Sequence, residues 1–158
     1  SSLYSTGLES KNAIEESRKK IADFINAENE KTIIFTGSAT ESNNLAIRGT
    51  AIRNQREGKD IAASAIEHIS VINPMKDLQK NVFKFNIISV DSNGNVDIEK
   101  LSNIVNKETL VTSNMYANNE IGTIEPIKKI SDSVQDYSVY ILNPDNNVQL
   151  LTIFCYSI

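Results

Sequence analysis

The sequence predicts an α/β protein whose mainly parallel sheet is flanked by helices. Short apolar runs typical of buried strands alternate with segments of helical periodicity along almost the whole chain. Alternation of this kind argues for crossover units, in which a helix connects two parallel strands. The chain has 158 residues, of which 40% are apolar and 23% charged. Both values are ordinary for one globular domain with its own core.

The alternating elements can be assigned in order along the chain. Helical spacing of apolar side chains predicts helices over residues 9–27, 41–56, 70–80, 97–105 and 126–134. Apolar runs predict strands over residues 32–36, 61–64, 82–90 and 109–115. The first helix is amphipathic, and its apolar face carries Ile14, Ile21, Phe24 and Ile25. Gly58 ends the second helix, and the cluster at 91–94 predicts a turn.

Charge and cysteine content narrow the range of partners. The net charge of -4 and the pI near 5.1 give no reason to expect nucleic acid or an anionic membrane as a partner. Cys155 is the single cysteine, so an intramolecular disulfide is impossible and a cytoplasmic location is expected. One histidine and one cysteine cannot form a zinc cluster. No apolar run approaches the roughly 20 residues of a membrane span.

A turn of small and hydroxyl residues, 37–40, lies between the first predicted strand and the second predicted helix. Free backbone N–H groups and the positive end of a helix dipole point at such a turn, so it can bind an anion, most often a phosphate. The Ser38 and Thr40 hydroxyls could add two hydrogen bonds. The alternative is that one of them is a plain N-cap. No Gly-Lys-Ser/Thr follows, which excludes a nucleoside-triphosphate loop.

Polar residues also follow two other predicted strands. His68, the single histidine, comes shortly after the strand at 61–64, and Asn118 and Asn119 follow the strand at 109–115. Ligands of α/β sheets gather beyond the carboxyl ends of the strands. There a histidine can stack on a flat cofactor or move a proton, and an asparagine amide can donate to an oxyanion. The alternatives are a partly buried, satisfied histidine and an ordinary turn.

Four stretches in order resemble the NifS-like cysteine desulfurases of the class V aminotransferase group. They are SSLYSTGLESKNAIEESRKKIADFI, IIFTGSATESNNLAIRG, EHISVI and ETLVTSNMYANNEIGTIEPI. The second is similar to the family's Phe-Thr-Ser-Gly-Ala-Thr-Glu-Ser-x-Asn, and the last to its Asn-Asn-Glu-Ile-Gly segment. The resemblance covers about residues 1–140. It implies part of the large cofactor domain of a fold-type I pyridoxal-phosphate enzyme, followed by a divergent tail at 141–158.

The resemblance also implies roles for individual residues. Ala39 and Thr40 fall on the positions that hold the phosphate of pyridoxal 5′-phosphate. His68 falls on the histidine that stacks on the pyridine ring, and Asn119 on the residue that bonds the ring's 3′-oxygen. The implied activity removes sulfur from L-cysteine to give L-alanine, in a family that is homodimeric. One departure is Gly37-Ser38, which reverses the family's Ser-Gly and places a Cβ beside the anion.

Other family residues have no counterpart in this sequence. The family's lysine that binds the cofactor covalently follows a histidine, whereas His68 is followed by Ile69. The family's aspartate and glutamine motif does not match the spacing of Asp145 and Gln149, and Cys155 is not in the context of the family's persulfide-forming cysteine. The sequence therefore predicts a truncated desulfurase-like chain with no catalytic residue assigned. The alternatives are a non-catalytic remnant and one half of a split enzyme.

Overall fold

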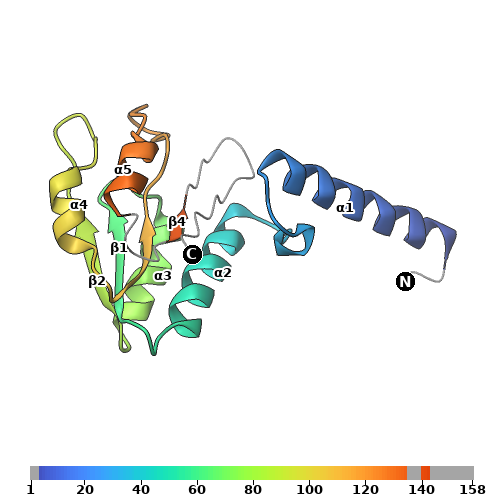
Figure 1. Cartoon of the computed structure of the whole chain (residues 1–158), viewed down its shortest axis with the longest axis horizontal. Coiled ribbons are helices and arrows are strands. Elements are labelled where there is room, and N and C mark those ends of the chain that lie inside the picture. The colour runs from blue at the N-terminus through green and yellow to red at the C-terminus, as the bar shows by residue number, and fades with distance from the viewer. Residues whose placement is uncertain (1–3, 135–139, 143–158) are drawn as a thin grey trace. The chain divides into compact units, whose positions relative to one another are not determined.

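The structure is a computed structural model, and it describes residues 4–134 and 140–142. The chain divides into two compact units, residues 1–36 and residues 37–158 (Figure 1). Most of the tail predicted at 141–158, including Asp145, Gln149 and Cys155, lies outside the described residues. None of the described helices is both long and apolar enough to span a membrane.

The first unit consists of the long helix α1 (Ser5–Phe24) and the short 3-10 helix η1 (Glu30–Thr32). Asn29 caps η1 by accepting a hydrogen bond from the Lys31 N–H at 2.9 Å. The Arg18 guanidinium of α1 donates to the Ile33 carbonyl and lies 5.0 Å from the Phe35 ring centroid. These two contacts hold the segment after η1 beside the helix.

The strand predicted at 32–36 is wrong. Thr32 ends η1, and no strand is assigned to residues 33–36. Ile34 and Phe35 are 65% and 40% exposed, so this apolar run is not buried. A strand is stable only when its backbone N–H and C=O groups pair with a neighbour. The described strands offer this segment no pairing, because their sheet is formed entirely by later residues.

The second unit contains a parallel sheet in the order β2-β1-β3-β4. Its strands are β1 (Asp60–Ser64), β2 (Lys84–Ile88), β3 (Thr109–Ser113) and β4 (Tyr140–Leu142). All the strand pairs within it are parallel, and the register places Ala63 beside Ile87 on one side and Ser113 on the other. The predicted α/β architecture with a mainly parallel sheet is confirmed.

Among the described residues four helices accompany this sheet, each within a few residues of its predicted position. They are α2 (Ala39–Arg53), α3 (Ile69–Gln79), α4 (Ile98–Ile104) and α5 (Ile127–Ser133). Side chains cap three of them: Ser38 for α2, His68 for α3 and Asp97 for α4. Each cap satisfies a backbone N–H that a helix leaves unpaired in its first turn.

The core consists of two apolar clusters, one for each face of the sheet. On one face α2 and α3 contribute Ile47, Val71 and Met75, which pack with Ile61 of β1. The other cluster joins Ala62 of β1 to residues of α4 and α5, such as Leu101 and Ile130. Successive strand residues point to opposite faces, so Ile61 and Ala62 fall in different clusters. Because β1 and β3 are parallel neighbours, the loops that follow them leave the sheet at the same edge.

Candidate functional site

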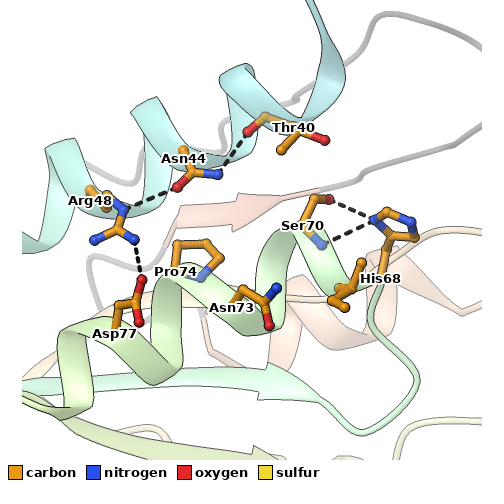
Figure 2. A pocket seen from close by; sticks show the side chains of 9 residues that line it. Thr40, Asn44, Arg48, His68, Ser70, Asn73, Pro74 and Asp77 are labelled. Carbon is orange, nitrogen blue, oxygen red and sulfur yellow. Dashed lines mark hydrogen bonds and ion pairs between the residues drawn. The ribbon is translucent and has the colours of Figure 1, made fainter.

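A cavity of about 230 Å³ lies between α2 and α3 in the second unit. Figure 2 shows the side chains that line it. They are Thr40, Asn44 and Arg48 from α2, His68 from its N-cap position, and Ile69, Ser70, Asn73, Pro74 and Asp77 from α3. The cavity thus brings together two of the four predicted site residues, Thr40 and His68.

Two backbone N–H groups at the start of α2 already donate to side chains of the same turn. The Ser38 hydroxyl accepts from the Glu41 N–H at 3.2 Å, which confirms the alternative that a residue of this turn is an N-cap. The Gly37 N–H in turn donates to the Glu41 carboxylate at 2.8 Å. A carboxylate of the chain therefore already occupies part of the electropositive end of the helix.

The remaining donors of this helix start fit a phosphate group. Ala39 and Thr40 are the first two residues of α2, where a backbone N–H has no partner within the helix. Both residues are exposed, and the Thr40 hydroxyl has no hydrogen-bond partner among the described residues. An added Cβ at Gly37 would lie 3.2 Å from the Glu41 carboxylate, so the turn is tight on that side. Two amides and one hydroxyl are the kind of donors that hold phosphate oxygens.

Hydrogen bonds on its ring hold His68 at the start of α3. Its Nδ1 accepts from the Ser70 N–H at 3.1 Å and lies 2.8 Å from the Ser70 hydroxyl. That hydroxyl also accepts from the buried Asn43 amide at 2.9 Å, so its proton is available for Nδ1. Because Nδ1 accepts, the neutral ring carries its proton on Nε2. The ring is thereby fixed between the starts of two helices.

An ion pair lines the far end of the cavity. Arg48 lies 2.8 Å from Asp77 across the cavity, and Asn44 accepts from the Arg48 guanidinium at 3.0 Å (Figure 2). Hydrogen bonds from Lys80 first and Arg48 second hold the pKa of Asp77 below its usual value. Because the charge of Arg48 is already paired with Asp77, Arg48 is not counted as a ligand for an anion. An anion in the cavity would instead be bound by the positive ends of α2 and α3 and by the Thr40 donors.

Asn119 lies on the loop after β3, is exposed, and is not part of the cavity lining. The neighbouring Asn118 is buried, and its side chain donates to the Ile66 carbonyl at 3.0 Å. The loop that carries Asn119 is therefore tied to the loop that carries His68. Parallel strands β1 and β3 lie side by side and bring these loops to the same edge of the sheet.

Three further residues of this region were not predicted from the sequence. Asn43 and Ser70 orient His68, while Glu67 lies buried directly before His68, as the predicted Asn118 does before Asn119. Asn43 and Ser70 fall on inward positions of helices, where an isolated polar residue could have signalled a buried hydrogen bond. Glu67 could have been singled out as a carboxylate that closely follows an apolar strand.

Comparison with known proteins adds the family context. The family model for aminotransferase class-V matches residues 1–143. Cysteine desulfurase IscS 1 of Archaeoglobus fulgidus is 49% identical over 134 residues, which are 85% of this chain and 35% of the relative. Cysteine desulfurase IscS of Dictyoglomus turgidum is 44% identical over 140 residues, 89% of this chain and 35% of the relative. The chain thus spans about a third of the length of these curated relatives.

Solved structures share the same fold. A NifS-like protein matches with a TM-score of 0.81 and 32% identity, covering 89% of this chain and 39% of that one. A structure described as SspA in complex with cysteine matches with a TM-score of 0.77 and 30% identity, covering 89% of this chain and 41% of that one. DndA from Streptomyces lividans has a TM-score of 0.81 at 29% identity, covering 90% of this chain and 40% of that one.

Proposed function

The chain belongs to the class-V aminotransferase family, and from this premise we propose that it is part of a pyridoxal-phosphate-dependent cysteine desulfurase. Its substrate would be L-cysteine, and its products L-alanine and a sulfur atom carried by the enzyme. The observation that carries the proposal is the cavity that unites the Thr40 donors with the His68 ring. We also place the protein in the cytoplasm and expect a homodimer, as in the family.

The residues of this chain would hold and orient the cofactor. The N–H groups of Ala39 and Thr40, with the Thr40 hydroxyl, would bind its phosphate. His68, fixed by Ser70, would present its ring face to the pyridine ring, and the Asn119 amide would donate to the 3′-oxygen. When bound, pyridoxal phosphate supplies an electron sink for bond breaking at the amino acid. These roles concern binding and orientation, and no residue of this chain is proposed to move a proton.

A second candidate function follows from the sequence itself. His68 is followed by Ile69, so the chain contains no His-Lys pair to provide a covalent attachment for the cofactor. The phosphate cradle, by which we mean the Ala39 and Thr40 donors at the start of α2, could then bind phosphate compounds without turnover. The chain would be either a non-catalytic remnant or one half of a split enzyme. Binding measurements on the chain alone and activity measurements on a completed enzyme separate these functions.

Phosphate binding at the start of α2 can be tested by titrating pyridoxal phosphate or inorganic phosphate into the dilute chain. We expect roughly millimolar affinity, about 4 kcal/mol of binding, with amide NMR shifts concentrated at residues 38–41. Thr40→Ala should weaken binding about tenfold or more, because a hydrogen bond to a charged group is lost. Glu41→Gln should strengthen it several-fold, since the competing carboxylate on the Gly37 N–H loses its charge.

Ser102→Ala is the matched control for this titration, because its exposed hydroxyl bonds only within α4. It should leave the affinity unchanged. Amide NMR shifts spread evenly over the chain, or shifts that persist in Thr40→Ala, would mean that the turn only caps the helix and does not bind phosphate.

Activity can be tested in a chimera. Residues 1–134 would replace the matching part of the Archaeoglobus fulgidus relative, which supplies the remaining two thirds of a desulfurase. We expect yellow cofactor absorbance and sulfide release from L-cysteine in the chimera, and neither in the 158-residue chain alone. Within the chimera, His68→Ala should lower kcat/KM by about 10-fold or more, while His68→Phe, which keeps a ring face, should lose less.

The result that contradicts the desulfurase proposal is a folded chimera that binds the cofactor and releases no sulfide. In that case the binding-only function would be the better account. Turnover by the chain alone would contradict the expectation that the activity needs the missing part.

A further inference from the structure

Each proposed ring contact directly follows a buried polar residue. Glu67 precedes His68 and is 9% exposed, and Asn118 precedes Asn119 and is 8% exposed. These pairs lie on the loops after β1 and β3, which are neighbouring strands. Buried polar side chains are retained where they make specific hydrogen bonds. The bonds of Glu67 and Asn118 therefore indicate how the two loops are held.

Asn118 connects the two loops through one amide group. Its Nδ2 donates to the Ile66 carbonyl at 3.0 Å, across to the loop that carries His68. Its Oδ1 accepts from the N–H groups of Glu120 and Ile121 at 2.9 and 3.0 Å. The same side chain thus shapes the turn that carries Asn119 and fixes that turn to the neighbouring loop.

Glu67 lies at the same junction, the contact between the loops that follow β1 and β3, on the loop that carries His68. The Ser64 hydroxyl at the end of β1 is 3.4 Å from its Oε1. Its Oε2 and the Ser113 hydroxyl at the end of β3 are both buried without a hydrogen bond of normal geometry among the described residues, although the hydroxyl is close enough to act on the pKa of Glu67. An ionised carboxylate only accepts hydrogen bonds, whereas a protonated carboxyl also donates one. The Ser113 and Ser64 hydroxyls can donate to an ionised Glu67, whereas a protonated Glu67 can itself donate to one of them.

The surroundings of Glu67 favour the protonated form. Burial raises the pKa of the Glu67 carboxyl to about 8, although the Ser113 hydroxyl, the Met115 backbone and the Ser64 hydroxyl act in the opposite direction. The charge of Glu125 adds to the rise. Glu125 is the other buried carboxylate here, and both of its oxygens accept from the Val96 N–H. His68 is the adjacent titratable side chain on the same loop.

We propose that Glu67 and Asn118 are positioning residues, which lock the loops of His68 and Asn119 to each other. His68 is then fixed from both sides, by Glu67 before it and Ser70 after it. That the locked residues face a pyridine ring rests on the proposed function. The coupling of the two loops does not, and it can be measured without any cofactor.

The test follows His68 and Asn119 by NMR in the dilute, ligand-free chain from about pH 6 to about pH 10. His68 is the single histidine, so its imidazole signals are directly assigned. We expect these signals to show a step near pH 8, where Glu67 loses its proton. The Asn119 amide signal should move together with this step. Glu67→Gln should remove the step and keep the low-pH positions, because glutamine stays uncharged at every pH.

Two matched variants complete the test. Glu99→Gln, the same change at an exposed position of α4, should leave the step near pH 8 in place. Asn118→Ala should shift the His68 signals across the junction, whereas Asn103→Ala, an exposed asparagine of α4, should not.

The proposal is overturned if the wild-type His68 and Asn119 signals show no common step, which needs no variant to fold. It is equally overturned if the step persists in Glu67→Gln. Failure of the phosphate titration would leave both results intact, so the proposal and the proposed function fail separately.

Discussion

Replacing Gly58 with alanine is expected to destabilise the fold by about 3 kcal/mol or more. Gly58 is buried between α2 and β1, and a Cβ there would lie 2.1 Å from the Glu108 carbonyl oxygen. The obstructing atoms belong to the backbone, so no side chain can rotate away. The same carbonyl accepts from the Asp60 N–H at 3.0 Å, where β1 begins beside β3. Relieving the clash must therefore disturb the pairing of two central strands.

Gly49→Ala provides the matched control, because it adds the same methyl group inside α2. An added Cβ at Gly49 meets no heavy atom within 4 Å. Alanine should then stabilise the helix by up to about 1 kcal/mol, since glycine is the poorer helix former. Urea unfolding of both variants gives the comparison. Similar small changes at the two positions would contradict the close approach of the Gly58 and Glu108 backbones.

The sequence predicted the parallel sheet and the helices because their signals are local. Alternating apolar runs and helical periods appear wherever an element buries one face, and the elements of residues 37–134 do so against each other. The run at 32–36 has the same local signal but no strand to pair with among the described residues. Strand formation depends on a partner that a local pattern cannot reveal.

The sequence predicted only part of the candidate site, because the other part depends on tertiary contacts that a local pattern does not reveal. Thr40 and His68 fall at the starts of helices, where small polar residues and sheet topology indicate a ligand, and the structure places both at one cavity. Asn43 and Ser70 orient His68 through contacts between α2 and α3, and such contacts depend on tertiary packing. For the same reason the sequence did not single out Glu67, whose carboxyl is buried only after β1 and β3 have paired.

That burial predicts how stability depends on pH. The folded pKa of Glu67 is about 8 and its ordinary value is 4.5, so the folded state holds the proton more tightly than the unfolded chain. The stability that this proton provides is fully present below pH 4.5. It is lost as the pH rises toward 8, and the loss is complete above that pH. A shift of this size corresponds to a few kcal/mol, at about 1.4 kcal/mol per pH unit.

Glu67→Gln should remove this dependence, because glutamine does not ionise. The variant is expected to be more stable than the wild type by a few kcal/mol above pH 8, and the difference should shrink steadily toward pH 4.5. Groups with a lowered pKa, such as Asp77 and Asp97, lose their contribution only at lower pH and affect both proteins equally. Urea unfolding at intervals across this range yields the difference curve. A flat curve would show that Glu67 keeps an ordinary pKa, and that the junction between the His68 and Asn119 loops is open to water.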